Sequence, residues 1–399
     1  QLYREQGADY RDNCERFVFF CRAVLESFRL LNLQVDVVHA NDWQTALLPT
    51  YLKIEYRQAP GYENIATLFT IHNLAYQGTF WHWDMLLTGL DWKYFNWRQL
   101  EFYGDLNLMK AGIVFADAVS TVSRRYAEEI QTPDFGCGLE GVLQQRRDSL
   151  FGILNGIDGT WDPASDKHLP VPYDSTSWEA GKATAKEVLR QEFGLPMTDG
   201  PVLGYVGRLA SQKGIDLLAD AMERTAGDGP MQWVILGTGE PMYHDQLLQL
   251  QSRYPQQLSV RLEFSERLAH LVEAGADMFV MPSRYEPCGL NQMYSLRYGA
   301  VPIVRAVGGL ADTVVDADEE SLEAGTANGF SFHQEFDRDP GPLVDAVRRA
   351  YATYMHKRHV WEQLVLTGMR QDWSWKASAR RYVELYSWTI DRLKLQTVE

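Results

Sequence analysis

The sequence predicts an α/β protein with two doubly wound halves, each built around a parallel sheet. Two observations predict this class: short apolar runs alternate with longer helical patterns along most of the chain, and a polar stretch at 161–177 interrupts that alternation once before it restarts. A length of 399 residues also favours two domains over one.

The first half predicts four strands separated by helical segments. Residues 13–31 and 43–56 have helical patterns, and Pro49 is expected to kink the second of them. The strands are expected at 35–40, 65–71, 117–123 and 150–154.

The stretch "WDPASDKHLPVPYDSTS" is polar and rich in Pro and Asp, which is typical of a linker. After it, six further strands are expected, at 200–207, 231–237, 259–264, 276–282, 300–305 and 329–332. The last segment, residues 373–395, has the pattern of an amphipathic helix. We therefore expect a first domain at 1–165, a second at 166–370 and a closing helix within 371–399.

Composition narrows the function classes. The net charge of -15 argues against a general nucleic-acid binder or a protein of anionic membranes, because both need basic surface. No apolar run is long enough to span a bilayer. The four cysteines form no C-x-x-C pair, which suits a reducing compartment such as the cytoplasm or a plastid stroma.

Several common catalytic motifs are missing from the sequence. "GTGEPM" lacks the third glycine of a dinucleotide-binding turn, and the chain has no P-loop, no H-E-x-x-H and no G-x-S-x-G. Two D-x-D triplets occur, at 316–318 and 337–339, but in acidic, Gly- or Pro-flanked stretches rather than at strand ends. We interpret them as solvated loops, and no metal site is expected.

The turns that follow the predicted strands hold charged and polar side chains, and in open α/β sheets ligands bind beyond the carboxyl ends of the strands. Arg208 and Lys213 share one loop before a helix, where they either bind a diphosphate or are ordinary exposed charges. Glu286, in "SRYEPCGLNQ", has no obvious partner nearby in the sequence and needs a functional reason.

Other strand ends are ambiguous when taken singly. His72 and Asn73 follow a strand directly, although a lone His there is more often structural. Asp42 either acts in the site or caps the next helix, and Asn155 either acts there or forms an Asn-Gly turn. Gly308 and Gly309 either present amides to a phosphate or form a tight turn.

Taken together these turns resemble the bacterial glycogen synthases and plant starch synthases. The matching segments are "VVHANDWQTALLP", "FTIHNLAYQGTF", "MKAGIVFADAVSTVS", "GILNGID", "GRLASQKGIDLL", "SRYEPCGLNQMYSLRYGAVPIVRAVGGLADTV" and "GFSF". They occur in family order over nearly the whole chain. The resemblance implies the GT-B glycosyltransferase fold, with two Rossmann-like domains facing a cleft and a C-terminal helix that crosses back to the first domain.

The same resemblance implies a function and a set of site residues. The expected reaction is retaining transfer of glucose from ADP-glucose to an α-1,4-glucan acceptor, with no cofactor. By resemblance, Glu286 faces the donor sugar, the amides of Cys288, Gly289 and Leu290 hold it, and Arg208 and Lys213 neutralise ADP. His72 is expected to face the glucose, with Asp42, Asn73 and Asn155 near it. Gly308, Gly309 and Leu310 resemble a phosphate-binding turn.

The sequence departs from the family in a few places. Gln44, Tyr285 and Val307 stand where many relatives carry His, Phe and Thr. The family's Lys-Thr-Gly-Gly-Leu turn is nowhere in the chain, and the chain opens in a helical pattern, "NCERFVFFCRAVLESF". The expectation is a first domain truncated at its start, with nucleotide binding kept and glucosyl transfer negligible.

Two alternatives stay open at this stage. The chain is either a GT-B transferase that uses another nucleotide sugar or a non-catalytic glucan-binding fragment. For the second, Trp81, Trp83, Tyr94 and Trp97 are candidates to stack on glucan, although packing is the simpler interpretation of most of them. The oligomeric state is not predicted.

Overall fold

The computed structural model describes residues 3–5 and 8–396 of the chain. The chain forms two compact units, one made of Gln1–Leu154 with Ala379–Glu399 and the other of Asn155–Ser378. The boundary, expected between residues 165 and 166, thus lies between Leu154 and Asn155. The segment expected to be a linker belongs to the second unit.

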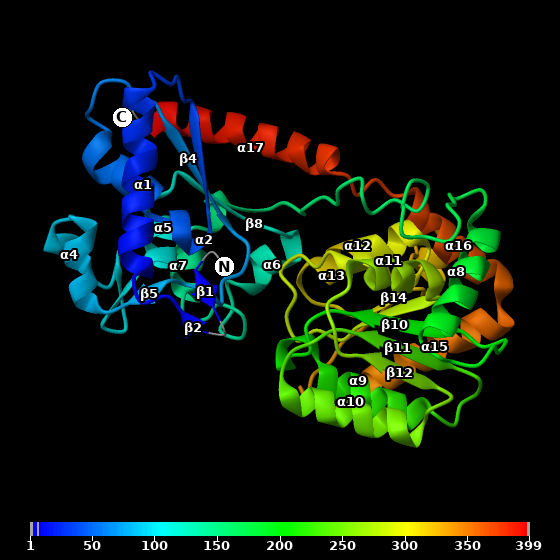
Figure 1. The fold of residues 1–399 in the computed structure, drawn as a ribbon. Helices are drawn as coiled ribbons and strands as arrows, with labels where there is room; N and C mark the ends of the chain where they lie inside the picture. Colours follow the sequence, from blue (N-terminus) through cyan, green and yellow to red (C-terminus); the bar gives the residue numbers. More distant parts are fainter. Residues whose placement is uncertain (1–2, 6–7, 397–399) are drawn as a thin grey trace. The chain divides into compact units, whose positions relative to one another are not determined.

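The second unit contains one six-stranded parallel sheet (Figure 1). Its strands are β10 (Val202–Val206), β11 (Gln232–Leu236), β12 (Leu258–Arg261), β13 (Met278–Met281), β14 (Val301–Arg305) and β15 (Phe330–Phe332). Their spatial order is β12-β11-β10-β13-β14-β15. The chain therefore adds β11 and β12 on one side of β10 and then crosses to add β13, β14 and β15 on its other side. This doubly wound order places a ligand at that switch point, beyond the carboxyl ends of the strands.

Helices cover both faces of this sheet (Figure 1). They are α8 (Trp178–Glu192), α9 (Ile215–Thr225), α10 (Pro241–Arg253), α11 (Glu266–Gly275), α12 (Asn291–Tyr298), α13 (Gly308–Thr313), α14 (Glu319–Glu323), α15 (Gly341–His356) and α16 (Arg358–Arg370). Side chains alternate along each strand: Leu203 of β10 belongs to the same buried cluster as Ile215 of α9, while its neighbour Val202 belongs to the cluster that holds Leu271 of α11. The strands therefore read as continuous apolar runs because both faces are buried.

The first unit contains a smaller parallel sheet in the order β3-β4-β8-β9. Its strands are β3 (Val37–Asn41), β4 (Ala66–Ile71), β8 (Ala118–Thr121) and β9 (Leu150–Gly152), and a three-stranded antiparallel sheet adds β5 (Thr79–Phe80), β6 (Glu101–Phe102) and β7 (Asp105–Asn107). A two-residue ribbon, β1 (Arg4–Glu5) with β2 (Ala8–Asp9), precedes the first helix. Neither the ribbon nor the antiparallel sheet is predicted by the sequence, because strands this short show no periodicity.

The helices of the first unit are α1 (Asn13–Leu30), α2 (Asp42–Thr45), α3 (Leu47–Tyr51), α4 (Met85–Thr88), α5 (Leu108–Phe115), α6 (Arg124–Glu129) and α7 (Glu140–Gln145). The helical segment expected at 43–56 is interrupted at Ala46, between α2 and α3. Pro49 explains the break, because its ring excludes the carbonyl of Thr45, four residues earlier.

The long helix α17 (Trp375–Gln396) begins in the second unit and ends in the first. Its Leu385 is buried with Leu68, Ala118 and Ile153 of the first unit's sheet strands and the loop after them. The closing helix expected from the sequence thus crosses back to the first unit. None of the described helices is long and apolar enough to cross a membrane.

Candidate active site

The second unit brings the predicted acid and one predicted cation together at the switch point. Nζ of Lys213, in the turn after β10, lies 2.5 Å from Oε2 of Glu286, in the turn after β13. Glu286 is 7% exposed and also accepts a hydrogen bond from Oγ of Ser283 at 3.0 Å. The sequence shows no obvious partner near Glu286, and its cationic partner indeed lies 73 residues away; the hydrogen bond from Ser283, in the same turn, was not expected.

Arg208 and Lys213 differ in their surroundings. The Arg208 side chain is exposed, and its Nη2 donates to Oε1 of Gln212 at 2.9 Å. The Lys213 side chain is only 23% exposed and ends the short 3₁₀ helix Ser211–Lys213. Lys213 is thus not an ordinary exposed loop charge, whereas Arg208 is exposed.

A third cation, Arg284, fixes the two turns to each other. Its guanidinium donates to both carboxylate oxygens of Asp216 at 2.8 and 2.7 Å, and its amide donates to the carbonyl of Gln212 at 2.8 Å. Bidentate pairs of this kind fix geometry as well as charge. Sequence reasoning did not single out Arg284, because its role depends on a contact between turns 68 residues apart.

The turn that follows Glu286 leaves three amides unpaired. Within the described chain, the backbone N–H groups of Cys288, Gly289 and Leu290 donate to no protein acceptor. Unpaired backbone donors are rare in a folded chain and point to a ligand or solvent partner. This arrangement fits the role expected for the three residues in holding a sugar.

The glycines after β14 serve a different purpose. The amide of Gly309 donates to the carbonyls of Glu286 and Pro287, and the amide of Leu310 donates to Val307. A Cβ on Gly308 would lie 2.0 Å from the Glu286 carbonyl oxygen, and one on Gly309 would lie 1.9 Å from that of Cys288. The amides of Gly309 and Leu310 are therefore already used inside the protein, and the glycines are needed for close approach of the two turns.

Asn155 lies beside the same turn. Its backbone hydrogen bonds the Cys288 sulfur, and this bond opposes the effect of burial, which raises the pKa of the Cys288 thiol to about 12. The side-chain oxygen of Asn155 is buried and, among the described residues, has no hydrogen-bond partner. Asn155 and Cys288 thus share one wall, as expected, and the thiol is held protonated.

An apolar pocket of about 650 Å³ lies at the carboxyl ends of β10, β11 and β12. We call it the base pocket; its walls include Gly207, Arg208, Thr238, Phe264 and Asn291. Phe264 is 92% exposed. The expected strand at 259–264 ends at Arg261, so Phe264 stands in a loop, where an aromatic face is free to stack on a flat ligand. Sequence reasoning missed this pocket because it placed Phe264 inside the strand.

In the first unit, Asp42 and His72 directly follow two neighbouring strands, β3 and β4. Oδ1 of Asp42 accepts the His72 amide at 2.7 Å, and Asp42 has a positive φ of 56°, a strained conformation for a residue with a Cβ. Burial raises the pKa of Asp42, while the His72 charge and the His72 and Asn73 amides oppose that rise. Helix α2 begins at Asp42 itself and its N-cap position is Asn41, so the alternative role of Asp42 as the helix N-cap is wrong.

The neighbours of Asp42 are also fixed. Nε2 of His72 lies 3.0 Å from Oδ1 of Asn41, and Oδ1 of Asn73 accepts the amide of Ala75 at 3.1 Å. The structure thus brings Asp42, His72 and Asn73 together at one sheet edge. Their roles toward a substrate stay predictions.

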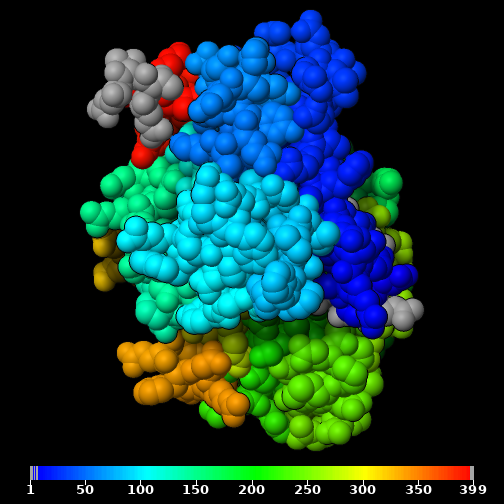
Figure 2. Space-filling view, turned by 90° about the vertical axis from the view of Figure 1, so that its left-hand side faces the viewer, coloured from blue at the N-terminus to red at the C-terminus, as the bar shows by residue number. Residues whose placement is uncertain are grey.

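Three of the four aromatic side chains considered for glucan stacking are exposed. The exposed fractions are 61% for Trp81, 49% for Trp83 and 67% for Trp97, whereas Tyr94 packs on the core of the first unit. Figure 2 shows the segment that carries them, in cyan, at the surface of the face turned to the viewer. The three tryptophans are therefore not core residues, although Trp81 and Trp83 pack edge to face on each other.

Both D-x-D triplets lie outside the helices and strands, as expected of loops, and Asp318, Asp337 and Asp339 are exposed to solvent there. Asp316 accepts the Ser331 amide and pairs with Arg349, and Asp318 caps α14 in a capping box. Asp337 pairs with Arg284 and Arg305. Their carboxylates already have protein partners.

Comparison with known proteins gives a consistent result. The family model described as "Starch synthase catalytic domain" matches residues 1–145, and "Glycosyl transferases group 1" matches residues 186–363. A glycogen synthase of Rhodopirellula baltica is 46% identical over 98% of this chain and 77% of its own length. Glycogen synthase 2 of Nitrosococcus oceani is 48% identical over 97% of this chain and 77% of its own.

Among solved structures, the catalytic domain of starch synthase IV from Arabidopsis thaliana, bound to ADP and acarbose, matches with a TM-score of 0.88. It is 33% identical to this chain, and the match covers 97% of this chain and 80% of that one. The α/β architecture of both units is the GT-B type that its structural neighbours share.

Proposed function

The chain belongs to the family of bacterial glycogen synthases and plant starch synthases, and we propose that its second unit binds ADP-glucose at the switch point between β10 and β13. The protein is a glycosyltransferase, and the reaction is retaining transfer of glucose to an α-1,4-glucan. The observation that carries the proposed site is the contact between Lys213 and Glu286 at this point of the sheet.

The base pocket fits the nucleoside part of the donor. It lies on the β10–β11–β12 side of the switch point, where doubly wound sheets bind a mononucleotide. The exposed ring of Phe264 offers a stacking face, and Arg208 lines the same pocket. A nucleoside in this pocket would carry its diphosphate toward Arg208 and Lys213.

The two cations suit the leaving group. As the bond between C1 of glucose and the phosphate oxygen breaks, its electron pair stays on the diphosphate, and negative charge grows there. Arg208 and Lys213 would neutralise that charge, and the unpaired amides of Cys288, Gly289 and Leu290 would hold the sugar. Glu286, released from Lys213 as the lysine turns to the diphosphate, would accept hydrogen bonds from the glucose hydroxyls.

We propose that transfer needs no divalent metal and no cofactor. A metal-dependent sugar transferase holds its metal with a free carboxylate triplet, and both triplets of this chain are occupied by Arg, Ser and amide partners. Arginine and lysine at the diphosphate supply the positive charge instead.

In the first unit, we propose that His72, Asp42 and Asn73 act on the sugar side of the reaction. The strained backbone at Asp42 and the bond that fixes it to His72 support this role, since strain of this kind clusters at functional sites. The exposed tryptophans of the same unit are proposed to contact the glucan acceptor. The cytoplasm or a plastid stroma stays the predicted location.

The test is elongation of a maltooligosaccharide by the full-length protein with ADP-glucose and, separately, UDP-glucose. We expect α-1,4-linked product with ADP-glucose preferred. A preference for UDP-glucose would favour the alternative donor, and binding of glucan without turnover would favour the non-catalytic alternative.

A further inference from the structure

The segment expected to be a linker folds against α11 and α12. The ring of Trp161 stacks between His270 of α11, at 3.8 Å, and Tyr294 of α12, at 3.9 Å, with interplanar angles of 10° and 11°. The linker interpretation is therefore wrong for this part of the segment, which is an ordered part of the second unit.

A buried carboxylate lies under this stack. Oδ2 of Asp166 lies 2.7 Å from Nδ1 of His270 and accepts the Tyr298 hydroxyl at 2.6 Å. Its other oxygen accepts the backbone amide of His168 at 2.8 Å. Asp166 therefore orients the His270 ring and the backbone that carries His168 at the same time.

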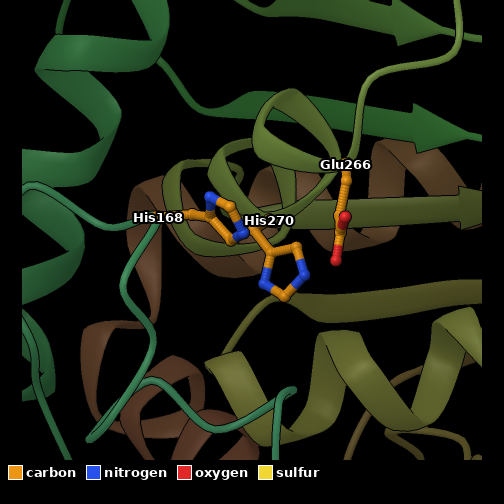
Figure 3. A group of neighbouring side chains, drawn as sticks. All are labelled: His168, Glu266 and His270. Atoms are coloured by element: carbon orange, nitrogen blue, oxygen red, sulfur yellow. The ribbon is translucent and has the colours of Figure 1, made fainter.

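Three possible metal ligands converge beside Asp166. One ligand atom each from His168, Glu266 and His270 lie within 4.8 Å of one another, and Figure 3 shows the three side chains gathered at the start of α11. His270 is buried, His168 is half-buried and Glu266 is exposed. Among the described residues, Nε2 of His270 has no hydrogen-bond partner.

We propose that His168, Glu266 and His270 form a binding site for a divalent transition metal, with Zn²⁺ the best match. Two imidazoles and one carboxylate are ligands that zinc takes readily, with one position left for water. In such sites a ligating His holds the metal with one ring nitrogen and hydrogen bonds a carboxylate or another acceptor with the other. Here Nδ1 of His270 has a carboxylate partner, Asp166, which leaves Nε2 for the metal. The carboxylates of Glu266 and Asp166 also offset the charge of a dication.

To bind the metal, the ligand side chains must move slightly closer together, and the two less buried ones, Glu266 and His168, can do so. Bonds of about 2.0–2.2 Å in a tetrahedron place ligand atoms about 3.4 Å apart, which is closer than the present limit of 4.8 Å. Rotation of the exposed Glu266 and the half-buried His168 can close the gap, while the buried His270 stays in place.

The metal would act as a clamp rather than in glucosyl transfer. His168 belongs to the segment after Trp161, and Glu266 and His270 belong to α11, so a shared ion would tie that segment to the helix. Trp161 and Glu266 also line the base pocket, so the clamp would steady one of its walls.

The test is titration of untagged, chelator-treated full-length protein with ZnCl₂ alone, followed by calorimetry and by melting temperature. We expect one equivalent to bind and to raise the melting temperature of the wild type. His168→Ala and Glu266→Gln should each weaken binding by about 10-fold or more, while His356→Ala, an exposed histidine on α15, should bind like the wild type.

Asp166→Asn tests the orienting carboxylate. It keeps an acceptor for the His168 amide but loses the charge facing His270, so Zn²⁺ affinity should fall by about 10- to 100-fold. Co²⁺ in place of Zn²⁺ should give the visible absorption of a four-coordinate site in the wild type and lose it in His168→Ala. The absence of stoichiometric binding, or equal binding by wild type, His168→Ala and Glu266→Gln, would overturn the proposal.

Discussion

At the scale of single residues, the site depends on partners that lie far apart in the sequence. Glu286 and Lys213 are 73 residues apart, and only the parallel sheet order brings them into contact. The sequence pattern predicts which turns carry charge, because a strand end can be recognised locally. It does not predict that the acid is paired, since pairing depends on which strands are neighbours.

Glu286→Gln should lower kcat by about 10²-fold or more, because the neutral amide loses the charge that Lys213 and the sugar hydroxyls contact. Glutamine keeps an oxygen for the Ser283 hydroxyl, so the melting temperature should stay within about 3 °C of the wild type. Steady-state kinetics and calorimetry check both points. A variant with full activity and a lower melting temperature would show that Glu286 is only structural.

Asp42→Asn should be less damaging to kcat than Glu286→Gln, since asparagine keeps the oxygen that accepts the His72 amide. The same assay compares the two variants side by side. Burial raises the pKa of the Asp42 carboxyl. A larger loss of kcat for Asp42→Asn would mean that the charge of this carboxyl contributes more to transfer than the charge of Glu286 does.

At the scale of elements, the ten predicted strands of the two main sheets are confirmed, with ends that differ by a few residues. Both faces of these strands are buried or nearly so, which gives continuous apolar runs that are easy to recognise. The small antiparallel sheet β5-β7-β6 was not predictable, because its strands hold two or three residues each. The end of β12 mattered most, since it decides whether Phe264 lies in a strand or in the base pocket.

Gly309→Ala should disturb the turn that carries Glu286. A Cβ there would lie 1.9 Å from the Cys288 carbonyl oxygen, so the turn must shift, and we expect a cost of about 1–3 kcal/mol with weaker ADP binding. Gly227→Ala is the matched control, since a Cβ added at Gly227 would have no other atom within 4 Å. Chemical denaturation and ADP titration should separate the two variants, and equal behaviour would contradict the packing account.

Helices α8 and α11 bury two titratable side chains, Lys182 and Glu273, which make stability depend on pH. Burial raises the pKa of Glu273 to about 8, opposed by the Ser295 hydroxyl and the Lys182 charge, and burial lowers the pKa of Lys182 to about 8. Lys182 donates to the carbonyls of Ala274, Ala276 and Tyr298.

The raised pKa of Glu273 determines whether the free energy of unfolding rises or falls with pH. The folded protein keeps this proton up to about pH 8, whereas the unfolded chain loses it near 4.5, so rising pH stabilises the unfolded state. The free energy of unfolding of the wild type should therefore fall relative to Glu273→Gln between about pH 5 and 8, by up to about 1.4 kcal/mol per pH unit. Urea denaturation of both proteins across this range checks it, and a constant difference would contradict the assignment.

At the scale of the whole molecule, the sequence predicts two units and a closing helix, but not the residue at which the first unit ends and the second begins. The polar stretch after Leu154 looks like a linker because it is rich in Pro and Asp. In the structure its Trp161 and Asp166 pack on α11 and α12, so the stretch belongs to the second unit. Polar composition signals a loop, and it cannot distinguish a free loop from one that is held by buried hydrogen bonds.

The reaction of the full-length protein should proceed with retention at the anomeric carbon and should continue in EDTA. The proposed zinc clamp predicts that EDTA lowers the melting temperature without abolishing transfer. Nuclear magnetic resonance of the product linkage and an assay in chelator check the two statements. β-Linked product, or complete loss of transfer in EDTA at a temperature where the protein stays folded, would contradict them.

The central claim is that Arg208 and Lys213 stabilise the departing diphosphate. Its most direct test is the kcat of Lys213→Ala and Arg208→Ala in the full-length protein, with Lys357→Ala, an exposed cation of the same unit, as the control. Because the charge on the leaving group grows toward the transition state, each site variant should lose about 10²–10³ in kcat with little change in glucan affinity, and the control should behave like the wild type. Near-normal kcat in both site variants would contradict the account.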